Sequence, residues 1–104
     1  MGTKFVVITR HTGFDKFWKR NFSSEEEAIE FERILTNGDY GKYESVGLIK
    51  EKKGGHRWCL CIKNPKEDWK KDVIFFNSKK SCILATKLIK EYNSDLIISY
   101  TKSY

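Results

Sequence analysis

Twice along the chain, an apolar strand pattern gives way at a serine to the pattern of an amphipathic helix. Ser24 is followed three residues later by Glu27, the spacing of a capping box, and Ser78 stands at the same place before the second helical pattern. Behind each serine, apolar residues recur at intervals of three and four, as on a helix with one buried face. These residues are Ala28, Phe31, Ile34 and Leu35 in the first helix, and Cys82, Ala85, Leu88, Ile89 and Tyr92 in the second.

Six other segments have the β-branched, aromatic or alternating character of strands. They lie at residues 5–8, 17–22, 43–51, 57–63, 73–76 and 96–100. Gly54 and Gly55 supply the positive φ angles of a tight turn, so we expect the third and fourth strands to form a hairpin. The expected order is β-β-α-β-β-β-α-β. The expected fold is α+β: a small, mostly antiparallel sheet with two helices packed on one face.

The length of 104 residues suits one domain, covering residues 1–104. Residues 22–35 and 76–89 are weakly alike at an offset of 54, with identities at Phe22 and Phe76 and at Ser24 and Ser78. Any two capped helices that follow strands share such features. The likeness is therefore explained by the common strand and helix pattern more readily than by a duplication.

The net charge of +6 is concentrated in the middle of the chain. Residues 42–80 hold eleven Lys or Arg against five Asp or Glu, whereas residues 1–41 hold six against seven. A concentrated positive charge is typical of surfaces that bind polyanions. Trp58 and Trp69 stand among these cations, and aromatic rings beside cations suit base stacking.

We therefore predict a non-enzymatic binding module whose surface around residues 50–80 engages nucleic acid. Strand alternation puts Trp58 on an apolar, buried face, which leaves Trp69 as the better candidate for an exposed ring. The residues expected to bind the partner are Lys50, Lys52, Lys53, His56, Arg57, Lys66, Trp69, Lys70, Lys71, Lys79 and Lys80.

The chain has three cysteines, Cys59, Cys61 and Cys82. An odd number without a secretory signal indicates free thiols in a reducing compartment, so we expect the cytoplasm of a cell or host. Structural zinc sites use Cys-x2–4-Cys spacings in loops, whereas Cys59 and Cys61 are one residue apart inside a strand. No metal and no other cofactor is expected.

Two histidines, His11 and His56, stand in or beside predicted turns. Together with a nearby Lys or Arg they could act as base, acid and cation in a small metal-independent nuclease. Nothing in the sequence brings them together, and no phosphate-binding Gly-rich loop or nucleophile elbow is present. A nuclease is therefore a minor alternative.

Protein binding is the main alternative. Open sheet edges can pair with a partner strand or with a second copy in a homodimer. In size and lysine content the chain is similar to phage-encoded proteins that interact with host proteins, which adds an inhibitor or adaptor directed at a host or defence protein. Its partner would be an acidic protein surface, bound through the basic surface or a sheet edge. No apolar run approaches the ~18 residues of a membrane span, so no membrane partner is expected.

Overall fold

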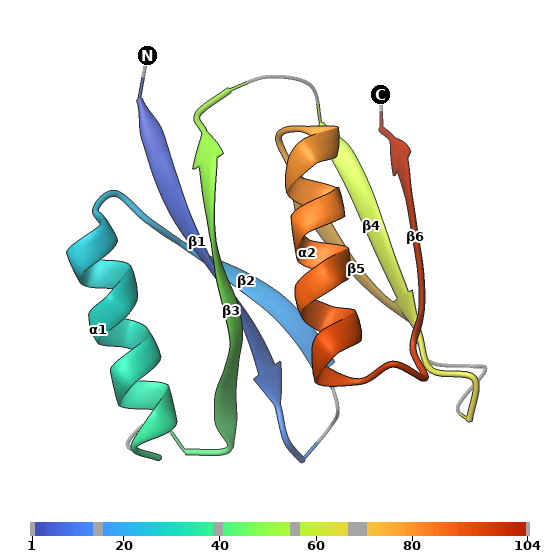
Figure 1. The fold of residues 1–104 in the computed structure, drawn as a ribbon, viewed down its shortest axis with the longest axis horizontal. Helices are drawn as coiled ribbons and strands as arrows, with labels where there is room; N and C mark the ends of the chain where they lie inside the picture. Colours follow the sequence, from blue (N-terminus) through green and yellow to red (C-terminus); the bar gives the residue numbers. More distant parts are fainter. Residues whose placement is uncertain (1, 14–15, 39–40, 55–56, 67–70, 104) are drawn as a thin grey trace.

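The computed structural model describes residues 2–13, 16–38, 41–54, 57–66 and 71–103. These residues form six strands and two helices, which confirms the α+β class expected from the sequence. Figure 1 shows their arrangement. The elements are β1 (Thr3–His11), β2 (Lys16–Phe22), α1 (Glu25–Thr36), β3 (Tyr43–Lys52), β4 (Trp58–Lys63), β5 (Lys71–Phe76), α2 (Lys79–Tyr92) and β6 (Ile97–Lys102).

Both helices begin where their serine caps predict. The Ser24 hydroxyl oxygen accepts the backbone N–H of Glu27 at 3.2 Å, and the Ser78 hydroxyl oxygen accepts that of Ser81 at 3.2 Å. Each cap satisfies one N–H group that the first turn of a helix leaves without an intrahelical acceptor. Asn37 and Asn93 cap the other ends.

The strands form two antiparallel sheets instead of the single sheet expected. The N-terminal sheet has the order β2-β1-β3, and the C-terminal sheet has the order β5-β4-β6. β3 and β4 do not pair, so the expected hairpin around Gly54 is wrong, although Gly54 has the positive φ of 80° that was anticipated. Each half of the chain instead places its own apolar strand, β1 or β4, between two neighbours.

The two helices lie on opposite faces of the N-terminal sheet, which differs from the expected packing on one face. Val7 of β1 packs with Ala28, Phe31 and Leu35 of α1. The alternate residues Val6 and Ile8 face the other way and pack against the cluster that contains α2. The run at residues 5–8 is apolar on both faces because β1 is covered on both faces. In Figure 1, α1 and α2 accordingly stand on either side of β3.

The larger core joins the two halves of the chain. Ile49 and Phe17 of the N-terminal sheet meet Leu60 and Phe76 of the C-terminal sheet in one cluster with the buried face of α2. Burying a Leu, Ile or Phe side chain contributes about 1.5–3 kcal/mol. Much of the apolar stabilisation is therefore shared between the halves.

The two halves have the same topology. Each runs strand, strand, helix, strand, and in each the first strand lies between the other two. The buried helical positions correspond at the offset of 54 noted in the sequence: Ala28 with Cys82, Phe31 with Ala85, and Leu35 with Ile89. None of the helices among the described residues has the length and apolar character required to cross a membrane.

Candidate binding groove

A groove of about 970 Å³ runs between β3 and α2. This volume is at the upper end of the range usual for ligand sites. Figure 1 shows the two elements side by side. The residues that line the groove are Thr3, Leu48, Ile49, Lys50, Glu51, Lys52 and Gly54 on the β3 side, and Asn77, Ser78, Lys80, Ser81, Leu84, Lys87, Leu88 and Glu91 on the α2 side.

The groove exists because of how closely α2 approaches β3 at one point. A Cβ atom on Gly47 would lie 2.5 Å from the Leu88 Cδ1 atom, so only a glycine admits α2 at this position. Beyond Gly47, the consecutive residues 48–52 of β3 line the groove. The groove opens along that stretch.

The helical wall combines charge with an apolar stripe. Lys80, Leu84, Lys87 and Leu88 recur at the spacing that puts residues on one side of a helix. Leu84 is 39% exposed, so its side chain is accessible on this wall. The wall therefore presents methyl groups between two cations.

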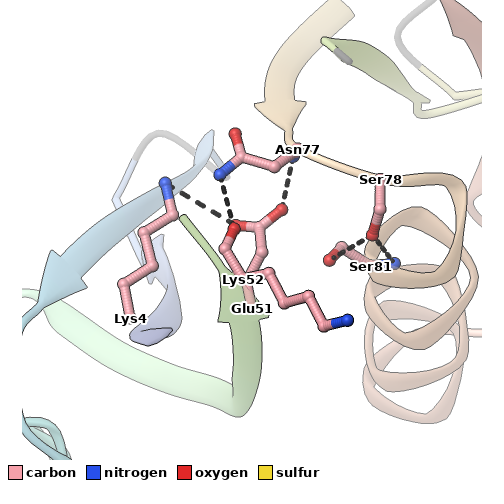
Figure 2. Close-up of polar contacts among 6 residues, drawn as sticks. All are labelled: Lys4, Glu51, Lys52, Asn77, Ser78 and Ser81. Atoms are coloured by element: carbon pink, nitrogen blue, oxygen red, sulfur yellow. Dashed lines mark hydrogen bonds and ion pairs between the residues drawn. The ribbon is translucent and has the colours of Figure 1, made fainter. Parts of the chain in front are cut away.

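The end of the groove near the start of α2 is fixed by a buried carboxylate, Glu51 (Figure 2). Its Oε1 atom accepts the backbone N–H of Asn77, and its Oε2 atom lies 3.7 Å from the Lys4 ammonium. Asn77 also donates from Nδ2 to the Lys52 carbonyl at 2.9 Å. Since Asn77 immediately precedes the helix cap, these bonds attach the start of α2 to the last two residues of β3.

A second carboxylate of β3 attaches the other end of α2. Glu44 Oε1 accepts from the Arg10 guanidinium at 3.0 Å and from the Tyr92 hydroxyl. Glu44 and Glu51 thus each pair with a cation of β1 and hold one end of α2. Both ends of α2 are therefore bonded to β3, on either side of the groove.

The first turns of the two helices carry opposite charges. α1 has Glu25, Glu26 and Glu27 there, which suits the positive end of a helix dipole. α2 has no acidic residue in its first turn and begins with Lys79 and Lys80. Two cations at this end cost stability, and an anion bound nearby would offset that cost.

Three of the lysines predicted from the sequence, Lys50, Lys52 and Lys80, line the groove. The Lys52 side chain extends from β3 towards the side where α2 begins (Figure 2). Within the part of the chain that the structure describes, these three lysines and Lys87 form no ion pair. Glu51 pairs with Lys4 and accepts from Asn77, and the four lysines outnumber Glu91, the other carboxylate among the lining residues, so the groove keeps an excess of positive charge.

Other predicted residues border the groove or lie elsewhere. Lys53 follows β3, and its N–H donates to the Gly2 carbonyl at 3.0 Å. Lys79 is exposed at the start of α2, and Lys66 is exposed after β4. His56, Trp69 and Lys70 lie outside the described residues.

Arg57 and Lys71 lie away from the groove, on the uncovered face of the C-terminal sheet. The Arg57 guanidinium is 3.8 Å from the centre of the Phe75 ring. Lys71 of β5 lies opposite Lys63 of the neighbouring strand β4. Trp58, expected to be buried, faces the opposite way and packs against the larger core. The basic surface predicted from residues 50–80 is thus divided between two faces.

The sequence-based interpretation missed Leu84, Lys87 and Leu88 as groove residues. Their signal was present, because Lys80, Leu84 and Lys87 are spaced as one helix face. The positive charge is concentrated in residues 42–80, whereas Leu84, Lys87 and Leu88 follow that segment, and only the tertiary fold places β3 opposite this side of the helix.

His11 and Cys82 lie outside the groove. The His11 ring packs edge-on against Tyr43 at 4.8 Å between centres, and its Nδ1 atom accepts the Gly13 N–H at 3.1 Å. Burial raises the pKa of the Cys82 thiol to about 11, and the negative charge of Glu51 adds to this effect. Among the residues described, no three His, Cys, Asp or Glu side chains gather as metal ligands would.

Comparisons with protein-family models, with curated proteins and with solved structures found no match for this chain.

Proposed function

We propose that the chain is a non-enzymatic binding module that takes an anionic partner into the groove between β3 and α2. The observation that carries this proposal is the set of four lysines, Lys50, Lys52, Lys80 and Lys87, around one groove without acidic partners among the described residues. The two lysines that open α2 support it, since they stand where a helix dipole favours an anion.

Nucleic acid and an acidic protein segment both satisfy this charge. Nucleic acid, the first expectation from the sequence, is favoured by the number of lysines available for phosphates. An acidic protein segment is favoured by the lining of the groove, which includes Leu84 and Leu88 and, among the residues that the structure describes, no aromatic ring on which a base could stack. Both classes of partner belong in the first experiment.

The test is a charge reversal with a matched control. The variant Lys52→Glu with Lys80→Glu reverses one lysine on each wall of the groove. The control, Lys63→Glu with Lys71→Glu, reverses a cross-strand pair of the C-terminal sheet and alters the net charge equally. Affinity for labelled polyglutamate and for labelled single-stranded DNA and RNA is measured by fluorescence anisotropy at 50 and 200 mM salt.

We expect the groove variant to lose at least tenfold in affinity for the partner that the wild type binds, while the control changes less than threefold. Four phosphate contacts on a single strand would weaken binding roughly 50-fold between the two salt concentrations. An equal loss in both variants would show non-specific attraction to a basic protein. Absence of binding to every polymer at 50 mM salt would reject the proposal, and cleavage of an oligonucleotide would reject its non-enzymatic part.

A further inference from the structure

β3 is the outermost strand of the N-terminal sheet. Within residues 2–13, 16–38, 41–54, 57–66 and 71–103, no strand pairs with its second edge. The outer edge of a strand presents a row of backbone N–H and C=O groups, to which an extended peptide can add as a further strand. The open groove lies along this edge.

The direction of the backbone groups follows from the pairing of β3 with β1. The Lys53 N–H donates to Gly2 of the β1 side, so the backbone groups of Lys53 point towards β1. In an antiparallel ladder this direction alternates along the strand. The N–H and C=O groups of Leu48, Lys50 and Lys52 therefore point away from β1, and the bond from Asn77 Nδ2 to the Lys52 carbonyl agrees with this.

The accessible edge has the dimensions of a short peptide site. Leu88 packs over the face of β3 at Gly47, and Asn77 occupies the Lys52 carbonyl at the other end. The stretch between them, residues 48–52, spans about 16 Å at the usual rise of a strand. Residues of α2 from Lys80 to Glu91 line the same groove, so a segment bound at this edge would also contact α2.

We propose that the anionic partner is an acidic, extended peptide segment of another protein, which adds to β3 as a fourth strand between β3 and α2. This inference rests on the proposed function, because it specifies the class of partner for the same groove. The edge offers both N–H donors and C=O acceptors at strand spacing. A peptide backbone matches both kinds of group, whereas phosphates only accept hydrogen bonds and leave the carbonyls unmatched.

The side chains around the edge define the sequence of the peptide. By strand alternation Lys50 and Lys52 leave β3 on the same face, and the Lys52 side chain then extends towards the side where α2 begins. On the other face, a peptide side chain meets α2, where Leu84 and Leu88 are flanked by lysines. A segment that alternates acidic with aliphatic residues fits both faces.

The test uses a labelled eight-residue peptide that alternates glutamate with valine. Two further versions carry backbone N-methyl groups, one on every glutamate and one on every valine. They have the same composition and charge, but they block opposite sets of N–H groups. Only one set faces β3: the glutamate amides for an antiparallel peptide, and the valine amides for a parallel one. The complementary set points away from β3.

We expect one N-methylated version to lose at least tenfold in affinity and the other to remain within threefold of the parent peptide. Equal loss in both, or loss in neither, overturns the inference. An oligonucleotide is titrated in parallel. If the oligonucleotide binds and the peptide does not, and if Lys52→Glu with Lys80→Glu abolishes the oligonucleotide binding, the inference is overturned and the proposed function stands. If neither the peptide nor the oligonucleotide binds, the proposed function itself is overturned. A concentration-dependent dimer that the peptide disperses would show that a second copy occupies the edge, which also contradicts the inference.

Discussion

A single glycine sets the distance between the two walls of the groove. Gly47 lies on β3 where the Leu88 side chain of α2 comes closest, and no other side chain would fit there. A methyl group at this position must displace either Leu88 or the strand, and such overpacking costs about 1–3 kcal/mol.

Replacing Gly47 with alanine is therefore expected to lower the free energy of unfolding by about 1–3 kcal/mol in urea titrations. In a Leu88→Ala background the methyl group has room, so the same replacement should cost less than ~0.5 kcal/mol. Equal costs in the two backgrounds would show that contact with Leu88 is not what restricts this position.

The buried thiol of Cys82 links stability to alkaline pH. Its pKa is raised from the ordinary value of 9.0 to about 11, first by burial and then by the charge of Glu51. The folded state therefore holds the thiol proton more tightly than the unfolded state does. The resulting stabilisation is fully present below pH 9 and is lost as the pH rises from 9 to 11.

We expect the free energy of unfolding to fall between pH 9 and pH 11, with Cys82 contributing up to about 2–3 kcal/mol of the fall. Lysines and tyrosines titrate in the same range, so the contribution is measured as a difference from Cys82→Ala. If the free energy of unfolding of Cys82→Ala falls as steeply between pH 9 and pH 11 as that of the wild type, Cys82 is not the source of this contribution.

At the scale of elements, two carboxylates of β3 hold the two ends of α2. Glu51 is buried and paired with Lys4, whereas the side chain of Glu44 is 38% exposed beside Arg10. Neutralising one partner of a buried ion pair leaves the other ion uncompensated. This lowers the free energy of unfolding more than the loss of an exposed pair does.

Glu51→Gln is accordingly expected to destabilise the fold by about 2–4 kcal/mol and Glu44→Gln by less than ~1 kcal/mol, both measured by chemical unfolding. Because Glu51 also holds Asn77 at the end of the groove, Glu51→Gln should weaken binding of the partner more than Glu44→Gln does. If Glu44→Gln destabilises the fold more than Glu51→Gln does, the bond between Glu44 and Tyr92 contributes more to stability than the contacts of Glu51.

The sequence was sufficient for the elements because their signals are local. Ser24 and Ser78 determine the helix starts through bonds within one turn, and the alternation at residues 57–63 correctly placed Trp58 against the core. The pairing of strands depends on distant contacts, and a local turn signal at Gly54 suggested a hairpin that does not form. The groove was missed for the same reason, since its walls are residues 48–52 and 80–88, which only the tertiary fold brings together.

At the scale of the whole molecule, the two halves share a topology but not separate cores. The larger cluster takes residues from both sheets, including Val6 and Ile8 from the first half and Leu60 and Phe76 from the second. Each half alone would expose its side of this cluster to water, and a chain of about 50 residues has little other apolar area with which to compensate.

We therefore expect one cooperative unfolding transition, coincident by circular dichroism and by tryptophan fluorescence. Separate fragments of residues 1–54 and 55–104 should be unfolded on their own. Two resolved transitions, or a fragment with a dispersed NMR spectrum, would show that the halves are independent units.

The most direct test of the groove as the binding surface is an ¹⁵N NMR titration of the whole chain with the alternating glutamate–valine peptide. We predict that the largest shifts map to residues 48–52 of β3 and 78–88 of α2, and that the amides of Leu48 and Lys50 become protected from exchange with solvent. Shifts centred on Arg57, Lys63 and Lys71, on the uncovered face of the C-terminal sheet, would contradict this assignment and move the binding surface to that face.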